Sequence, residues 1–501
     1  MRTIGAMSAT EYQLMLPMVE LTIFALGILL IDLLLPLHLK WLNAVGAFAG
    51  VAFATLCVWR IQTSMPRGAL GFFNSLLVDR FAMYFWYLFL ASAAVTILMS
   101  VRYLELEDEQ HGEYYALILM SVVGMMCLAA GIDIVLLFIG LELMAISIYV
   151  LVGFLRRDRR SNEAALKYLL LGAFSSGIFA YGLSLFYGIS GSTNLGVIRQ
   201  AVTTLAGKDP HNPILIVALL TTIVGLLFKI AAVPFHQWAP DAYEGAPTSI
   251  TGFMSVAVKA AAWALLLRIL VYGLLPLRAL YAPIFVFVAI ATMTGGNLAA
   301  MTQTNTKRLL AYSSIAHVGY MLLAFVAMGS APLTSPAFTD GFKGILIYLM
   351  VYTFMNLGVF AVITSLRQRN VIGDELDDLS GLYSRAPVEA VLMLLFLLSL
   401  AGIPPAAGFL GKYYIFLSLI ESQHYWLASA AVLYALFGLY YYLRIANAMF
   451  MREAPAGESA RLPITLAMRT AVGVAALATI VIGIFPEPFI RTVNWSLGIV
   501  R

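Results

Sequence analysis

Four charged side chains lie deep inside long apolar stretches of the sequence: Glu142, Lys229, Lys259 and Lys412. A charge at the centre of a membrane helix costs about 2.5–3.5 kcal/mol even on the mildest insertion scale. Such groups are tolerated where they face the interior of a helix bundle, pair with one another, and carry ions or protons. Their types and placement therefore predict a row of protonatable sites across a membrane protein. Such a row of sites would act as a proton relay.

Glu142, in IVLLFIGLELMAISIYVLVGF, and Lys229, shortly before Pro234, are predicted to form a switch. Burial favours the uncharged form of each group, whereas contact between them keeps both charged. Separation then allows the lysine to release its proton, which an arginine could not do. A static buried ion pair that only joins two helices is the alternative interpretation.

Lys259 lies about midway along GFMSVAVKAAAWALLL, and Lys412 follows Pro405 by seven residues. Together with Lys229, these two lysines place a protonatable amine in each half of the chain and one near the junction. Snorkelling of the ammonium to the membrane surface explains Lys259 poorly, because it is far from either end of its apolar stretch. We therefore expect all three lysines to act as relay sites.

His236 and His317 are the histidines that lie within apolar segments. Imidazole titrates near neutral pH, so both are candidates for proton shuttling beside the lysines. A hydrogen-bonded packing histidine is the alternative for each. Polar neighbours of His317, such as Ser313, Ser314 and Tyr320, could order water or could simply join helices by hydrogen bonds.

The sequence predicts no cofactor or metal site in this chain. Cys57 and Cys127 lie in separate apolar segments and form no CxxC pair, which argues against iron–sulfur ligation and structural zinc. Gly411-Lys412 lacks the upstream glycine of a phosphate-binding loop. No nucleotide, flavin or haem site is predicted, and we expect no nucleic-acid partner.

The elements that must position these residues are membrane helices. The 501 residues are 61% hydrophobic and 11% charged, and a membrane crossing needs about 20 residues. About fourteen apolar segments predict an all-α polytopic protein in a lipid bilayer. The first segment, 14–35, is too long for a signal-peptide core and is expected to be retained. The loop cluster at 156–160, rich in arginine, favours both termini on the periplasmic side of a bacterial inner membrane.

Two of the apolar segments are broken at corresponding places, the seventh at Pro234 and the twelfth at Pro404-Pro405. Broken helices persist in membranes where they are buried or line a wet cavity. The breaks are five segments apart, which predicts two inverted five-helix repeats with binding groups at the broken helices. Two kinked helices without a repeat are the alternative. The predicted units are 1–112 (three helices), 113–275 (first repeat, helices 4–8), 276–452 (second, inverted repeat, helices 9–13) and 453–501 (helix 14).

At these residues the chain resembles a known family: subunit N of the proton-pumping NADH:quinone oxidoreductase (respiratory complex I), an antiporter-like membrane subunit. The resemblance covers nearly the whole chain. The segments that carry it, in the family's order, are FIGLELMAISIYVLVGF, SNEAALKYLLLGAFSSGIFAYG, VPFHQWAPDAYEGAPTSITGFMSVAVKAAA, TKRLLAYSSIAHVGY and AGIPPAAGFLGKYYIF.

The resemblance implies roles for particular residues. The family's buried glutamate matches Glu142, and its lysines of helices seven, eight and twelve match Lys229, Lys259 and Lys412. The histidine after the first break matches His236. It also implies fourteen helices in two inverted units, other membrane subunits as neighbours, and a peripheral redox arm that holds flavin and iron–sulfur clusters.

The function expected from this resemblance is proton translocation coupled to electron transfer from NADH to a quinone such as ubiquinone, with no redox centre in this chain. Three other functions remain open at this point. A subunit of a multi-subunit cation/proton antiporter would share the broken helices and buried lysines, as would a membrane subunit of a hydrogenase- or ferredoxin-linked complex. A free-standing solute carrier would need a substrate pocket, and no such constellation stands out.

Overall fold

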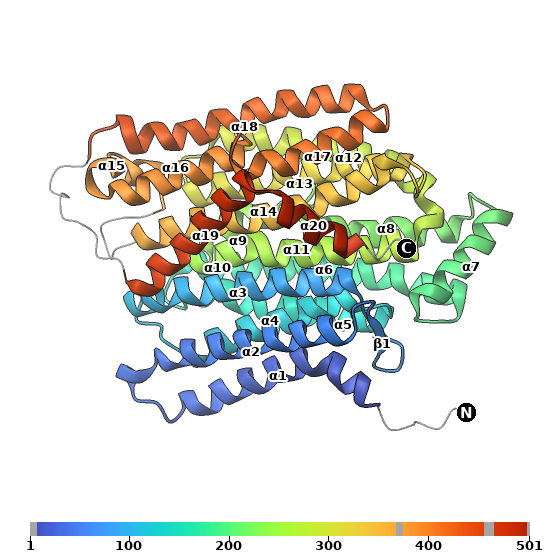
Figure 1. Ribbon diagram of the computed structural model, residues 1–501, viewed down its shortest axis with the longest axis horizontal. Coiled ribbons are helices and arrows are strands. Elements are labelled where there is room, and N and C mark those ends of the chain that lie inside the picture. The colour runs from blue at the N-terminus through green and yellow to red at the C-terminus, as the bar shows by residue number, and fades with distance from the viewer. Residues whose placement is uncertain (1–7, 367–373, 455–464, 498–501) are drawn as a thin grey trace.

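The computed structural model describes residues 8–366, 374–454 and 465–497. Within these ranges, 13 helices are long and apolar enough to cross a membrane. The apolar helix α16 (Pro387–Ala401) continues after a break as α17 (Ala407–Glu421), and the pair makes one further crossing. The spans lie side by side in one bundle (Figure 1). The predicted all-α polytopic fold with about fourteen crossings is confirmed.

The first part of the chain supplies the helices that precede and form the first break. Helices are the expected solution because every backbone polar group in lipid must find a partner within its own segment. The helices are α1 (Ala9–Asp32), α2 (Leu42–Ser64), α3 (Arg80–Leu106), α4 (Gly112–Ala130), α5 (Ile134–Val152), α6 (Arg159–Ser190), α7 (Leu195–Lys208), α8 (Pro213–Ile230) and α9 (Trp238–Gly245).

The rest of the chain is built in the same way. Several helices begin at a side chain that accepts a hydrogen bond from the first turn, as Asp133 does for α5 and Asn305 for α13. The remaining helices are α10 (Thr248–Phe253), α11 (Lys259–Leu267), α12 (Arg278–Thr302), α13 (Thr306–Ser330), α14 (Pro336–Leu366), α15 (Leu382–Arg385), α18 (Tyr425–Met451), α19 (Leu466–Ile484) and α20 (Glu487–Ser496).

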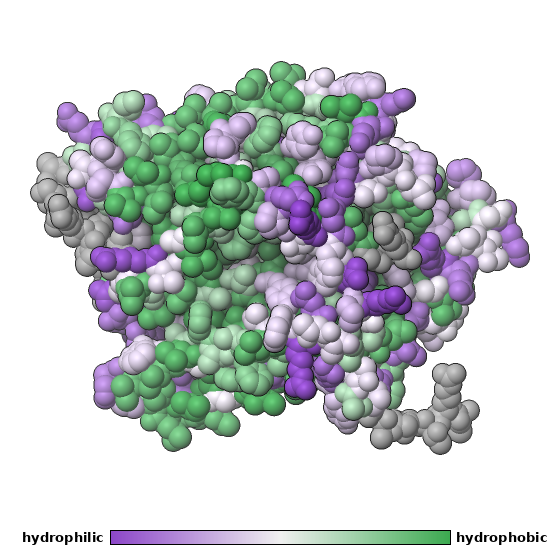
Figure 2. Space-filling view, viewed as in Figure 1, coloured by the Kyte–Doolittle hydropathy of each residue, from purple (hydrophilic) through white to green (hydrophobic). Residues whose placement is uncertain are grey.

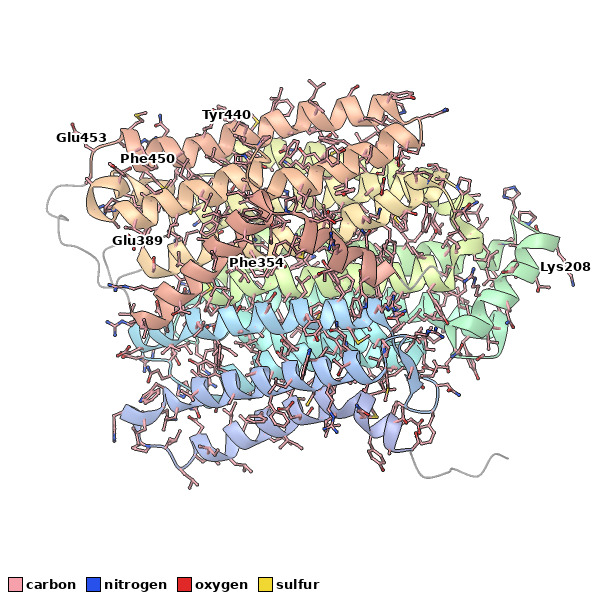
Figure 3. All side chains as sticks on the ribbon, viewed as in Figure 1. Lys208, Phe354, Glu389, Tyr440, Phe450 and Glu453 are labelled. Carbon is pink, nitrogen blue, oxygen red and sulfur yellow. The ribbon has the colours of Figure 1, made fainter. Side chains whose placement is uncertain are left out.

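The bundle has two distinct ends. One end, here called the terminal face, carries the first and last described residues of the chain, α7, α20 and a hairpin of β1 (Ala69–Gly71) and β2 (Leu76–Val78) (Figure 1). The strands are antiparallel, with Leu70 opposite Leu77. The opposite end, the far face, carries α15. Lys208 marks the tip of α7 on the terminal face, and Glu389 and Glu453 lie toward the far face (Figure 3).

The face of the bundle shown in Figure 2 is largely apolar between its two ends. Hydrophilic side chains lie at the far-face edge and over the part of this face that is nearer to the terminal face. This pattern is the one expected of a bundle whose sides face lipid or apolar partner surfaces and whose ends face water.

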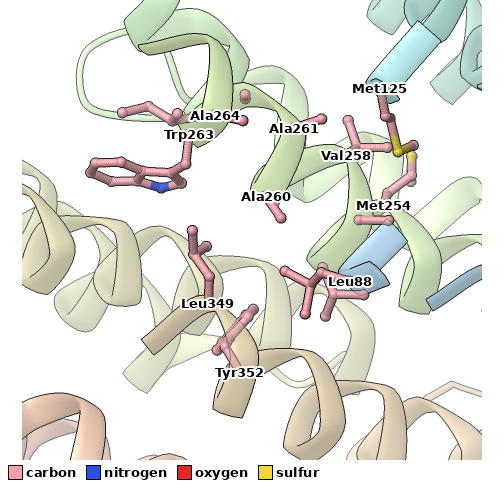
Figure 4. Packing of buried hydrophobic residues seen from close by; sticks show 14 of the residues in the cluster. Leu88, Met125, Met254, Val258, Ala260, Ala261, Trp263, Ala264, Leu349 and Tyr352 are labelled. Carbon is pink, nitrogen blue, oxygen red and sulfur yellow. The ribbon is translucent and has the colours of Figure 1, made fainter. Parts of the chain in front are cut away.

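The helices differ in how deeply they lie in the bundle. In the span Thr248–Gly273 the most apolar window is fully buried, and in α13 and α14 the corresponding window is 94% buried. In α18 this share is only 28%. Figure 4 shows the central span between Met125 of α4 and Leu349 and Tyr352 of α14. The helices that carry Lys259 and His317 are therefore among the innermost of the bundle.

The central span is not a regular α-helix throughout. A π-helical segment, Met254–Val258, directly precedes Lys259, and a second one covers Arg268–Gly273. A π-helical turn widens the spacing of backbone hydrogen bonds and occurs frequently at functional sites.

The first break lies where the sequence predicts it. Helix α8 ends at Ile230, and Ala231 takes a left-handed conformation with φ of 59°. The N–H of Ala232 then donates to the carbonyl of Leu227 at 2.9 Å, which closes the helix end. The Val233–Pro234 peptide bond is cis, and the chain re-enters a helix at α9.

The second break has the same form. Helix α16 ends at Ala401, and Gly402 takes a left-handed conformation with φ of 85°. The N–H of Ile403 donates to the carbonyl of Leu398 at 3.1 Å. The Pro404–Pro405 peptide bond is cis. Because the two broken helices cross the bundle in opposite directions, their matching ends agree with an inverted arrangement; the predicted unit boundaries stay a prediction.

Candidate proton-relay site

Lys229 lies at the end of α8, one residue before the helix terminates, and its side chain is 4% exposed. Its ammonium is 3.5 Å from the hydroxyl of Tyr149 on α5 and 5.9 Å from the centre of that ring. The ring of Phe228 lies at 5.8 Å. Among the residues that the structure describes, Lys229 is therefore held in an aromatic pocket by weak contacts and has no carboxylate at ion-pair distance.

The aromatic pocket around Lys229 extends across the first break. Tyr149 meets Tyr168 of α6 edge to face at 4.6 Å, and Tyr168 stacks on Trp238 of α9 at 4.3 Å. Trp238 also donates from its indole N–H to the carbonyl of Phe228 at 2.9 Å. The hydrogen bond thus joins α8 to α9, the two pieces of the broken helix, next to Lys229, and the ring stack joins α9 to α6.

Glu142 forms no ion pair with Lys229 among the described residues. It lies on α5 two turns before Tyr149, on the same side of the helix, and close enough to Lys229 to interact electrostatically. Its buried Oε1 has no hydrogen-bond partner within the part of the chain that the structure describes. The predicted switch requires contact and separation of the two groups, and the structure shows the separated arrangement.

Lys259 is 3% exposed and points at α13. Its ammonium donates to the carbonyl of Ser314 at 3.2 Å and to the hydroxyl of the same residue. Both acceptors are neutral, so these contacts are compatible with either a charged or an uncharged amine at Lys259. The serine that sequence analysis placed beside His317 in fact binds Lys259.

His317 lies one helical turn after Ser314 and is 2% exposed. Its Nδ1 shares a hydrogen bond with the hydroxyl of Tyr348 on α14, and its Nε2 shares one of 2.9 Å with the hydroxyl of Tyr442 on α18. Tyr442 is in turn hydrogen-bonded to Ser313. The imidazole is close enough to interact electrostatically with both Lys259 and Lys412. The histidine therefore lies within electrostatic range of both lysines and is hydrogen-bonded to tyrosine hydroxyls at both ring nitrogens.

Lys412 lies on α17 and reaches back across the second break. Its ammonium donates to the carbonyl of Ala401 at 2.6 Å and to that of Leu400 at 3.2 Å, at the end of α16. The ring of Tyr320 is 5.2 Å away. The last carbonyls of a helix have no partner within it and carry partial negative charge, so an ammonium is a favourable cap there.

His236 is half-buried in the first break, two residues after Pro234. Its ring is hydrogen-bonded to none of the three lysines within the described part of the chain. The structure therefore brings Lys259, His317 and Lys412 together around Ser314 and the tyrosines, places Lys229 and Glu142 beside Tyr149, and leaves His236 apart from both groups.

Sequence analysis missed Arg268, although a charge in the apolar run WALLLRILVYGLL could have identified it. Its side chain is fully buried and bonds both carboxylate oxygens of Asp79, at 2.8 and 2.6 Å. It also donates to the carbonyl of Ala129 at 2.8 Å and lies over the ring of Phe81 at 4.8 Å. This residue anchors the central span to α3 and α4 near the terminal face, away from the lysines.

The tyrosines that complete the site were also missed. Tyr348 and Tyr442 contact His317, and Tyr149 contacts Lys229, but they come from α14, α18 and α5. Tyrosines are common in this sequence, with 25 in the chain, so no single tyrosine stands out. Only the packing of distant helices shows which ones meet the titratable groups.

Comparisons with known proteins place the chain in a family. A family model described as "NADH:quinone oxidoreductase/Mrp antiporter, TM" matches residues 131–438, which include all six predicted relay residues. The chain therefore belongs to this family of antiporter-like membrane subunits.

Within that family, the chain is similar to subunit N. It is 63% identical over 500 residues to NADH-quinone oxidoreductase subunit N 1 of Koribacter versatilis, covering 98% of this chain and 96% of that protein. A chain of respiratory complex I from Thermus thermophilus is 32% identical, with a TM-score of 0.77 and coverage of 95% and 98%. A chain of the Mrp complex from Dietzia sp. has a TM-score of 0.76 at 20% identity, covering 96% of this chain and 97% of that one, and this similarity shows the fold alone.

Proposed function

We propose that this chain is the proton-translocating, antiporter-like subunit N of an NADH:quinone oxidoreductase and that it conducts protons through Glu142 and its buried lysines. Its similarity to proteins named as that subunit, over almost their whole length, supports the identity of the complex. The family match and the similarity to a chain of respiratory complex I support the same assignment.

One observation carries the proposed relay: His317, on one of the innermost helices, lies within electrostatic range of both Lys259 and Lys412. Ser314 binds Lys259, and His317 follows one turn later with a tyrosine hydroxyl at each ring nitrogen. A proton on Lys259 can pass to this hydroxyl network and on toward Lys412 when its groups reorient or admit water. Lys259 and Lys412 donate only to carbonyl and hydroxyl groups among the described residues. Either lysine can therefore gain or lose a proton without leaving a carboxylate unpaired.

Glu142 and Lys229 form the entry side of the proposed relay. Contact between them would keep the proton on Lys229, and separation favours its release, because a buried ammonium without a counter-charge is costly. We infer that the energy for this cycle comes from other subunits of the complex. We propose that it binds no cofactor and that flavin and iron–sulfur clusters in partner subunits supply the energy by electron transfer from NADH to quinone.

The surface of α5 supports a partner subunit at Glu142. Val135, Ile139, Ile146 and Val150 are each 49–57% exposed and lie on the same stripe as Glu142. A carboxylate on a lipid-facing stripe would be costly, so we propose that another membrane subunit of the complex covers it. The peripheral redox arm would then act through the membrane subunits.

The distribution of basic residues supports an orientation. Arg156, Arg157, Arg159 and Arg160 lie where α5 ends and α6 begins, on the far face. By the positive-inside rule we propose that the far face is cytoplasmic and that the terminal face, with both termini, is periplasmic, in a bacterial inner membrane.

The experiment that tests this function is affinity purification of the chain in mild detergent, followed by reconstitution into vesicles. NADH-dependent quinone reduction coupled to proton uptake, with flavin and iron–sulfur absorbance, is expected. Lys259→Met should leave assembly intact and lower the number of protons taken up per NADH. A colourless assembly that is inert to NADH but exchanges sodium for protons would contradict the proposal and favour a multi-subunit antiporter.

A further inference from the structure

A cavity at the terminal face is lined by residues from both halves of the chain. It has a volume of about 420 Å³ and lies between α7, the turn Leu275–Leu277 and the loop that follows α13. A second cavity, of about 550 Å³, adjoins it along α7, since Arg199 and Thr203 line both. Each volume lies within the range of about 300–1,000 Å³ that is usual for small-ligand sites. The proposed relay uses neither cavity.

Two half-buried arginines line the first cavity, one from each half of the chain. Arg199 of α7 donates to the carbonyl of Tyr272 at 3.4 Å. Arg278, the first residue of α12, donates to the carbonyl of Ala331 at 3.0 Å. These bonds orient each guanidinium and leave other N–H groups of it without an acceptor among the described residues.

The two cavities contain no counter-charge for these arginines. Within the described part of the chain, no aspartate or glutamate lines either cavity, and neither Arg199 nor Arg278 forms an ion pair. A guanidinium binds carboxylate and phosphate groups through strong, charge-assisted hydrogen bonds. Two such groups on one cavity therefore indicate an anionic ligand.

The remainder of the first cavity is mainly apolar. Leu275 and Pro276 line it from the turn before α12, and Pro332 and Leu333 line it from the loop after α13. Leu333 is 37% exposed although its side chain is apolar. An inorganic anion would leave this surface in water, whereas a hydrocarbon chain would bury it. The cavity thus combines a site for a phosphate group with a surface for an acyl chain.

The first cavity lies at the depth where lipid headgroups are found. The span that contains α12 begins at Leu275, and its neighbour α13 ends at Ser330. The central span ends at Gly273, next to Tyr272, which lines the second cavity. The ends of membrane-crossing segments lie where the hydrocarbon core meets the polar headgroups. Basic pockets between membrane helices bind acidic lipid headgroups.

We propose that the first cavity binds an anionic phospholipid of the surrounding bilayer. Arg199 and Arg278 hold its phosphate, and an acyl chain lies on Leu275 and Leu333. The second cavity has room for the polar part of the headgroup beyond the phosphate, beside Gln200. The lipid thereby joins α7, in the first half of the chain, to the loop after α13, in the second half. This site is independent of the proposed relay, and its test does not measure proton pumping.

Photo-crosslinking of the purified complex in vesicles tests the site. The vesicles contain mainly phosphatidylcholine and a small share of phosphatidylglycerol that carries a diazirine near the start of one acyl chain. After illumination and digestion, mass spectrometry should find the label on the turn Leu275–Leu277 and on the loop 331–334. The same diazirine on phosphatidylcholine should label these segments several-fold less, because choline offsets the charge of the phosphate.

Thr334→Glu tests whether the charge of the cavity selects the lipid. Thr334 lines the first cavity and is exposed, so a glutamate there places an anion beside the arginines without disturbing the core. Labelling by phosphatidylglycerol should fall to the level of phosphatidylcholine. Gly207→Glu is the matched control and should label as the unmodified chain does. Gly207 is exposed beside Lys208 at the tip of α7 (Figure 3), lines neither cavity, and a Cβ there meets no atom within 4 Å.

The double variant Arg199→Gln/Arg278→Gln should lose the preference for phosphatidylglycerol as well. Unchanged labelling in this variant and in Thr334→Glu would exclude the arginines as ligands of the phosphate. Equal labelling of the unmodified chain by both lipids would show ordinary contact with the bilayer. Equal losses in Thr334→Glu and Gly207→Glu would show that any added charge on α7 or its surroundings repels the lipid.

A competition experiment distinguishes a lipid from a soluble anion. Inorganic phosphate is added to the same vesicles, and sodium chloride of equal ionic strength serves as the control. Labelling by phosphatidylglycerol should be the same in both, because a free phosphate cannot cover the apolar wall. Loss of labelling in phosphate alone would overturn the lipid site in favour of a site for a soluble anion.

Discussion

The two broken helices are closed by the same backbone geometry but completed by different side chains. At the first break, the neutral indole of Trp238 donates to the carbonyl of Phe228. At the second break, the ammonium of Lys412 donates to the carbonyls of Leu400 and Ala401. Lys229, at the first break, is itself part of the helix that ends there and has only weak contacts.

Lys229 and Lys412 lie at corresponding breaks, but this difference shows that their structural roles are not the same. Lys412 satisfies backbone carbonyls that have no other donor in the described part of the chain, so its charge contributes to stability as well as to the proposed relay. Lys229 does not donate to the end of a helix. In the first half of the chain, Trp238 provides that hydrogen bond, to the carbonyl of Phe228. Stability and proton transfer are therefore expected to change together at Lys412 and separately at Lys229.

Lys412→Ala is expected to have the largest effect. It removes a relay group and leaves the carbonyls of Leu400 and Ala401 buried without donors, at a cost of about 1–3 kcal/mol for each unsatisfied group. Proton uptake per NADH should fall, and thermal unfolding of the assembled complex should occur at a lower temperature. Lys412→Arg is the matched control: it keeps the donors but cannot release a proton, so stability should recover without pumping. Full recovery of pumping in Lys412→Arg would show that Lys412 acts only as a helix cap and not as a relay group.

Lys229→Met is expected to abolish proton transfer through the first half and leave stability almost unchanged. Methionine keeps the length of the side chain and removes a buried charge that forms no ion pair within the described residues. Loss of a positioned acid–base group lowers proton-transfer rates by about 10²–10⁴-fold. Proton uptake in vesicles and thermal unfolding should be measured side by side. Normal uptake would exclude Lys229 from the relay, and strong destabilisation would show that it is a structural residue like Lys412.

Trp238→Phe should have a smaller effect, mainly on stability. The substitution removes the indole N–H that caps α8 and keeps a ring to stack on Tyr168. We expect a loss of about 1 kcal/mol, the net value of one hydrogen bond, with assembly and pumping largely kept. Differential scanning calorimetry of the purified complex measures it. A loss as large as that of Lys412→Ala would mean that the two caps are equivalent after all.

Ser314→Ala should have the smallest effect, because Lys259 keeps the Ser314 carbonyl as an acceptor. One hydrogen bond is lost, worth about 0.5–1.5 kcal/mol. The rate of proton uptake should fall modestly, since the hydroxyl that leads from Lys259 toward His317 is gone. Threonine at this position keeps a hydroxyl and provides the control. An effect of Ser314→Thr equal to that of Ser314→Ala would point to packing instead.

Much of the fold was readable from the sequence. The apolar segments predicted the spans, and Pro234 and Pro404-Pro405 marked both breaks, because proline cannot donate the hydrogen bond that continues a helix. The order of the family's segments along the chain identified the family that the comparisons then showed.

The candidate site was readable only in part. The buried lysines stood out because charge is rare in apolar segments, and by the same criterion Arg268 should have been noticed. The capping role of Lys412 could not be read, since the carbonyls it contacts belong to α16 and are brought to it only by the turn of the chain. The separation of Glu142 from Lys229 is likewise a matter of packing between α5 and α8.

Composition and the positions of the charged residues were enough to predict a bundle of membrane helices with charged groups inside it, because the cost of placing polar groups in lipid constrains composition directly. The tertiary structure alone decided which neutral groups meet each lysine, as with Ser314 and Lys259, and which charged groups bridge the two halves, as with Arg308 and Asp241. Such contacts join residues that are far apart in the chain, and only the packing of the helices fixes their distances.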